Sequence, residues 1–114
     1  MKKLILFSSL FLGLLVVTPA FAKALKIVPN KDVCMVTNMH FAKTQIPVEV
    51  NGKTYYGCCQ NCKKTLAEDA SARTAEDPVS HKEVDKATAT TAVLDDGSVL
   101  YFENKDNVKK YKAN

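Results

Sequence analysis

The residues best suited to chemistry are three cysteines within five residues, Cys58, Cys59 and Cys62, together with Cys34 upstream. Thiolates are strong ligands for zinc and copper(I), and the same sulfur atoms can instead form disulfides. If a helix begins near Cys59, spacings of three and four residues bring all three side chains to its first turn. Free N–H groups at a helix N-terminus favour negative charge, so thiolates should form there readily. The cluster therefore predicts a metal site, which Cys34 would approach from the loop before the first strand.

Two other uses of the sulfurs stay open from the sequence. Two disulfides would staple a structural or interaction module. Adjacent Cα atoms are about 3.8 Å apart, too close for Cys58 to pair with Cys59, so Cys34 would bond to one of them and Cys62 to the other. Cys59 and Cys62 also have the spacing of a redox-active C-x-x-C motif, although no βαβ pattern precedes it. Apart from this possible thiol redox activity, the sequence shows no catalytic constellation, and we expect no enzyme.

The number of ligands depends on Cys59, which the sequence leaves as a fourth ligand, a disulfide partner or a small apolar side chain. Three thiolates would suit copper(I), and four would suit tetrahedral zinc. Soft or imidazole ligands near Cys34 can also complete a site, namely Met35, Met39 and His40. Each is a weaker candidate than the cysteines, because methionine commonly fills cores. His81, in the second half of the chain, is weaker still.

The elements that must position these cysteines are two hairpins, each followed by a helix. Asn51-Gly52 and Asp96-Gly97 are strong hairpin signals, because glycine accepts a positive φ without steric cost. The flanking residues predict strands over 46–50, 54–56, 90–94 and 99–102. Apolar residues at helical spacing predict helices over 63–72 and 106–112. The expected fold is α+β, with two tandem β-hairpin–helix units, similar to zinc-ribbon or treble-clef units, packed together.

The two hairpin–helix segments resemble each other, which predicts an internal duplication. Aligning Gly52 with Gly97 places Tyr56 on Tyr101, Cys58 on Glu103 and Cys62 on Asn107, and Cys34 falls on Ser80 after a one-residue slip. The proline in Asp77-Pro78 separates the halves. We therefore predict a cysteine-bearing unit over 23–76 and a cysteine-free repeat over 77–114. The repeat would bury a hydrophobic face that one hairpin and helix cannot bury alone.

The first 22 of the 114 residues have the pattern of a secretory signal peptide. Lys2 and Lys3 precede an apolar run, Leu4–Val17, and small residues then allow cleavage between Ala22 and Lys23. Removing the two lysines lowers Lys and Arg from 16 to 14 against 12 Asp and Glu, so the net charge falls from +4 to +2. This near-neutral balance does not indicate a nucleic-acid partner. We expect a periplasmic protein that has no membrane segment after cleavage.

Two cysteine-containing segments, Asp32-Val33-Cys34-Met35 and Tyr55-Tyr56-Gly57-Cys58 with Cys62, resemble the YHS and TRASH group of small metal-associated domains. In that pattern a cysteine in an opening loop precedes an aromatic pair and a C-x3-C motif. The second half resembles the same segments with the cysteines replaced, so the similarity covers most of 30–114. The resemblance implies coordination of copper or another heavy metal by Cys34, Cys58 and Cys62.

These observations together predict an exported protein that binds copper(I), or alternatively zinc, for sequestration, transfer or sensing. A metal-handling protein is the candidate partner. The two alternatives are the disulfide-stapled module and a small thiol–disulfide oxidoreductase.

Overall fold

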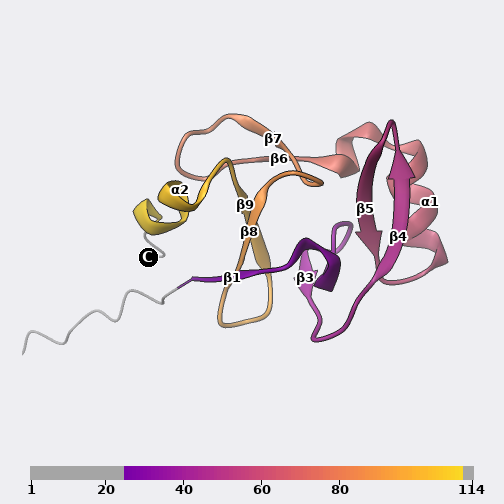
Figure 1. The fold of residues 1–114 in the computed structure, drawn as a ribbon, viewed down its shortest axis with the longest axis horizontal. Helices are drawn as coiled ribbons and strands as arrows, with labels where there is room; N and C mark the ends of the chain where they lie inside the picture. The colour runs from indigo at the N-terminus through magenta and orange to yellow at the C-terminus, as the bar shows by residue number, and fades with distance from the viewer. Residues whose placement is uncertain (1–24, 112–114) are drawn as a thin grey trace, which may run out of the picture.

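Two long hairpins, each followed by a helix, form the framework of the fold (Figure 1). The computed structural model describes residues 25–111, so the predicted signal peptide and its cleavage site lie outside the described residues. In the first half, β4 (Ile46–Val50) and β5 (Lys53–Gly57) precede α1 (Gln60–Glu68). In the second half, β8 (Thr90–Val93) and β9 (Val99–Phe102) precede α2 (Lys105–Lys110). The predicted α+β class is confirmed, with small antiparallel sheets and two helices.

The turns of both hairpins have the backbone that their sequences predict. Asn51 and Gly52 have φ values of 51° and 77°, and Gly97 has a φ of 89°. Positive φ at both central residues matches the right-handed twist of the paired strands, which explains the Asn-Gly pair. The register that follows pairs Val50 with Lys53 in one hairpin and Val93 with Val99 in the other.

Several short elements were not predicted. Before the first long hairpin lie β1 (Lys26–Val28), a 3-10 turn η1 (Asn30–Asp32) and a small hairpin of β2 (Val33–Cys34) and β3 (Met39–His40). A second small hairpin joins β6 (Thr74–Glu76) to β7 (Glu83–Asp85). The order small hairpin, long hairpin and helix therefore occurs twice along the chain, and the second set begins with β6, just before residue 77.

The helix starts before the predicted range 63–72, close to Cys59 as the metal-site prediction assumed, and it ends before residue 72. It begins at Gln60 because Cys59 is its N-cap, and it stops at Glu68. A separate 3-10 turn, η2 (Ala70–Arg73), follows because the Asp69 side chain accepts the N–H of Ser71 and starts a new turn. Local capping of this kind competes with continuation of the helix.

The two halves share strands and core. β1 pairs antiparallel with β8, so a strand that precedes all four cysteines extends the sheet of the second half, in the order β1-β8-β9. The main core cluster draws on both halves, with Val33, Met35 and Leu66 from the first and Tyr101 from the second. A division of the chain between 76 and 77 consequently remains a prediction.

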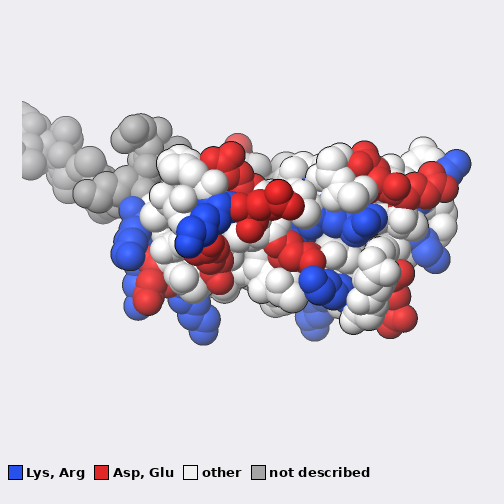
Figure 2. Space-filling model, turned by 90° about the horizontal axis from the view of Figure 1, so that it is seen from above, with Lys and Arg blue, Asp and Glu red and all other residues white. Residues whose placement is uncertain are grey.

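The surface of the described part carries charges of both signs. On the face in Figure 2, Lys and Arg side chains lie among Asp and Glu, and no extended area of one sign appears there. Within residues 25–111, no helix is long and apolar enough to cross a membrane.

Candidate metal centre

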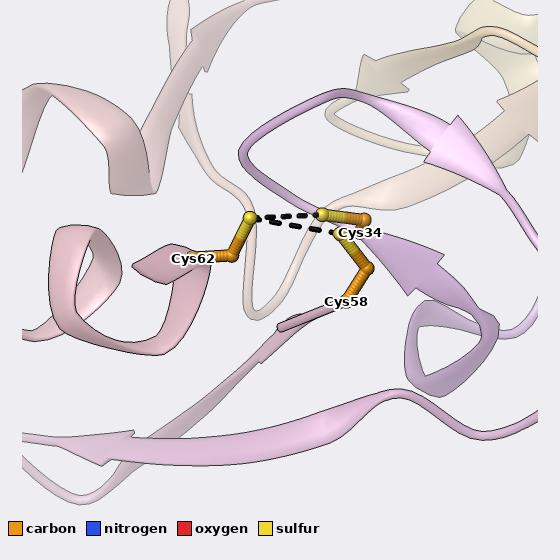
Figure 3. A group of neighbouring side chains, drawn as sticks. All are labelled: Cys34, Cys58 and Cys62. Atoms are coloured by element: carbon orange, nitrogen blue, oxygen red, sulfur yellow. Dashed lines mark hydrogen bonds between the residues drawn. The ribbon is translucent and has the colours of Figure 1, made fainter. Parts of the chain in front are cut away.

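Three separate segments bring Cys34, Cys58 and Cys62 together. Cys34 ends β2, Cys58 directly follows β5, and Cys62 lies in the first turn of α1 (Figure 3). The backbone bond from Met35 N to Tyr56 O, 2.8 Å long, fixes β2 beside β5 and so places Cys34 near the other two. The three Sγ atoms all lie within 4.8 Å of one another, which is close enough to hold a metal ion.

Cys62 is the centre of the sulfur cluster. Its Sγ lies 3.8 Å from that of Cys34, 3.6 Å from that of Cys58 and 3.4 Å from that of Cys59. Burial, followed by hydrogen bonding of the protonated thiol with the sulfurs of Cys59, Cys58 and Cys34, raises the pKa of Cys62 to about 12. The expectation of ready thiolate formation at the helix start is therefore not met at Cys62, because burial disfavours the charged form of its thiol.

The pKa of Cys34 is shifted in the opposite direction to that of Cys62. Burial raises the pKa of Cys34, but hydrogen bonds from the Thr37 hydroxyl and from the backbone N–H groups of Thr37 and Val36 lower it to about 7. These donors come from the turn 35–38, which folds back on Cys34 through a 2.8 Å bond from Asn38 N to Cys34 O. Asn38 closes this turn with a φ of 56°, a left-handed conformation that asparagine tolerates well. The turn thus provides preformed stabilisation for a thiolate at Cys34.

Gly57 makes the close approach of β5 to the helix possible. A Cβ placed on Gly57 would lie 2.9 Å from the Cβ of Cys62 and 3.2 Å from its carbonyl carbon. Those distances are too short for side-chain and backbone atoms in contact. The glycine before Cys58 is therefore required by the geometry of the sulfur cluster.

Cys59, whose role the sequence left open, caps the helix. It has an extended backbone, with φ −155° and ψ 175°, and its Sγ accepts the N–H of Cys62 at 3.5 Å. It is exposed, and it does not belong to the group of sulfurs that all lie within 4.8 Å of one another. The Cys62 N–H, the largest cause, lowers the pKa of Cys59. The structure thus gives Cys59 a capping role at the edge of the cluster.

The weaker candidate ligands lie elsewhere. Met35 is fully buried in the main core, and Met39 packs near Gly97 in the second long hairpin. His40 does not join the sulfur group. His81 is exposed, and its Nδ1 lies 2.9 Å from Oε1 of Glu76.

All four cysteines are free thiols, so the structure lends no support to a disulfide-stapled module. Comparison of the chain with models of protein families, with curated proteins and with solved structures finds no match.

Two polar residues of the second half were missed by sequence reasoning. Lys86 is buried, and its Nζ donates to Met35 O at 2.6 Å and to Asn38 Oδ1 at 3.0 Å. Asp77 is also fully buried and accepts four hydrogen bonds. No local pattern marks either residue as buried, because their partners lie far away in the sequence or in short turns.

Proposed function

We propose that this protein binds a thiophilic metal ion through Cys34, Cys58 and Cys62, with copper(I) favoured and zinc as the other candidate. The single observation that carries the proposal is the mutual approach of these three sulfurs within 4.8 Å, from three separate segments of the chain. The resemblance of the same segments to YHS and TRASH domains points to the same residues. Sequestration, transfer or sensing of the ion in the periplasm is the role that we propose.

The sulfur separations support direct coordination. A tetrahedral zinc site with Zn–S bonds of about 2.3 Å has sulfurs about 3.8 Å apart, and a trigonal site with similar bonds has them slightly further apart. Cys62 lies 3.8 Å from Cys34 and 3.6 Å from Cys58. Small side-chain adjustments would therefore give a coordination geometry. The capping role of Cys59 leaves three sulfurs, the number that favours copper(I).

The exposure of the sulfurs supports exchange of the ion with another protein. Cys34 and Cys62 are buried, whereas Cys58 and Cys59 are exposed. A site with one exposed ligand allows a thiol of a partner to replace that ligand while the buried pair holds the ion. A metal-handling protein with thiolate ligands is accordingly the partner that we propose.

Metal analysis of the purified protein tests this function. We expect one copper(I) per chain after anaerobic loading, measured by mass spectrometry, with loss of binding in Cys34→Ser and Cys62→Ser. Cys59→Ser is the matched control, because serine keeps the cap and removes only the sulfur outside the group. Wild-type protein that takes up neither copper(I) nor zinc would exclude the proposal.

A second candidate, thiol–disulfide exchange, rests on the exposed Cys59 at the start of a helix, 3.4 Å from the Cys62 sulfur. In such a reaction the two thiols would reduce a substrate disulfide by two electrons and form a Cys59–Cys62 disulfide. Reduction of a model protein disulfide by the wild type, and its loss in Cys59→Ser, would favour this function. Retention of metal binding together with no reductase activity would exclude it.

A further inference from the structure

A buried lysine from the cysteine-free half reaches the turn that follows Cys34. Lys86 follows β7 and is 5% exposed. Its Nζ donates to the carbonyl of Met35, the residue next to Cys34, and to the side chain of Asn38. It also lies 5.1 Å from the centre of the Tyr101 ring. The ammonium group is therefore fixed beside the loop that holds the Cys34 sulfur.

This buried cation has no carboxylate partner within the part of the chain that the structure describes. Even Asp85, the acidic neighbour of Lys86 in the sequence, is paired with another lysine, Lys53. A buried charge is costly unless an opposite charge or several hydrogen bonds compensate it. Two hydrogen bonds and one aromatic face surround the Lys86 ammonium, and none of these groups carries a negative charge.

A thiolate at Cys34 would stand one residue before Met35, whose carbonyl accepts the Lys86 ammonium. Burial lowers the pKa of Lys86, and the negative charge of Cys34 acts in the opposite direction. The same thiolate, after burial, contributes to the raised pKa of Tyr101, whose ring lies beside the ammonium. Cys34, Lys86 and Tyr101 thus share one electrostatic environment.

We propose that Lys86 is the counter-ion of the thiolate cluster, a positioning residue that offsets the negative charge of the loaded site and selects a monovalent over a divalent ion. The inference rests on the proposed metal-binding function. Three thiolates with a monovalent ion carry one more negative charge than the same thiolates with a divalent ion. A fixed positive charge therefore stabilises the monovalent complex more.

The ratio of copper(I) to zinc affinity isolates this effect. Both affinities refer to the same metal-free protein, so any change in the stability of that state cancels in the ratio. The measurement is made in the Cys59→Ser background, so that zinc cannot gain a fourth protein sulfur. Copper(I) and zinc are each titrated in competition with a chromophoric chelator of known affinity.

We expect Lys86→Met to lower the copper(I) to zinc affinity ratio by about tenfold, since a unit charge is removed from a low-dielectric site. Lys86→Arg keeps the positive charge, so its affinity ratio should stay near that of the Cys59→Ser protein with Lys86 unchanged. An equal loss of both affinities in Lys86→Met would show a merely structural role and overturn the proposal.

A second variant covers the case in which Lys86→Met does not fold. Asn38→Asp preserves the size of the side chain and supplies Lys86 with a carboxylate, so it should lower the ratio in the same direction. An unchanged ratio in Asn38→Asp would overturn the proposal. If the Cys59→Ser protein with Lys86 unchanged binds neither ion, the proposed function fails and this inference fails with it. Metal binding with an unaltered ratio in the variants refutes only the role of Lys86.

Discussion

In the cysteine-free half, the carboxylate of Asp77 joins three elements: the small hairpin of β6 and β7, the end of β9, and helix α2. Asp77 accepts the N–H groups of Val79 and Ser80 through Oδ1, at 2.6 and 3.0 Å. Its Oδ2 accepts the Glu103 N–H at 2.8 Å and the Asn107 side-chain amide at 2.9 Å. All four of these hydrogen bonds to Asp77 come from groups of the protein itself.

In the cysteine-bearing half, sulfur atoms meet at the corresponding place. Cys34 comes from the small hairpin, Cys58 follows the second strand, and Cys62 occupies the same position in its helix as Asn107 does in the other. Thiols are weak hydrogen-bond donors and acceptors, so their contacts stabilise little. One half therefore closes with hydrogen bonds, whereas the other places three sulfurs close enough to hold a metal ion.

Removal of the Asp77 carboxylate should have the largest effect. Asp77→Ala leaves four donors without their acceptor in a buried site, so we expect a loss of about 4 kcal/mol in the free energy of unfolding. Denaturant unfolding of the metal-free protein measures it. Asp69→Ala is the control, because Asp69 caps η2 on the surface and its loss should cost about 1 kcal/mol. Equal losses in the two variants would contradict the central role of Asp77.

Bound metal should raise the free energy of unfolding only when the sulfur cluster of the cysteine-bearing half is intact. At a free copper(I) concentration of about 100 times the dissociation constant, binding to the folded state alone adds about 2.7 kcal/mol. We expect this shift in the wild type and in Asn107→Ala. Cys62→Ser should abolish the shift while changing the metal-free stability little. A shift that persists in Cys62→Ser would place the ion elsewhere.

Acid should lower the stability of the protein by protonating the Asp77 carboxylate. Burial raises the pKa of Asp77, but bonds from Glu103, Asn107, Ser80 and Val79 outweigh it and lower the pKa to about 2. The usual value is about 3.9, so this stabilisation is complete above that pH and disappears as pH falls through about 2. Stability measured from pH 5 to pH 2 should therefore fall more steeply in the wild type than in Asp77→Asn. Parallel profiles would argue against a stabilised carboxylate.

The parts of this comparison that the sequence predicted are those with local signals. The Asn51-Gly52 and Asp96-Gly97 turns identified both long hairpins. The cysteine spacing brought Cys58 and Cys62 together, and the resemblance to the YHS and TRASH pattern added Cys34 to them. Strand β1 and the small hairpins were missed because two or three residues carry no measurable periodicity. The burial of Asp77 and Lys86 was missed for another reason. Polar residues are normally exposed, and only the tertiary fold supplies the partners that make their burial possible.

The two halves also differ in the residue that ends the second strand of the long hairpin, just before the helix. Alignment of the two turn glycines places Gly57 on Phe102, a fully buried core residue. Gly57→Ala should push Cys62 away from its partners, destabilise the protein by about 2 kcal/mol and weaken metal binding. Gly52→Ala is the control, because a Cβ there meets no atom within 4 Å, although its φ of 77° is strained for alanine. It should cost stability without changing the metal affinity. Equal metal affinities in the two variants would refute the steric argument.

The helix caps provide the smallest test, because here the two halves should behave alike. Asn104 caps α2 with a side chain that accepts the Asn107 N–H at 2.8 Å, and its backbone angles of −160° and 172° are close to those of Cys59. Alanine at either cap should cost about 1 kcal/mol, with a smaller loss at Cys59 because sulfur is the weaker acceptor. Cys59→Ser should restore that stability and leave the metal stoichiometry and affinity unchanged. A large fall in copper(I) affinity in Cys59→Ser would make Cys59 a fourth ligand. The two caps would then differ in function.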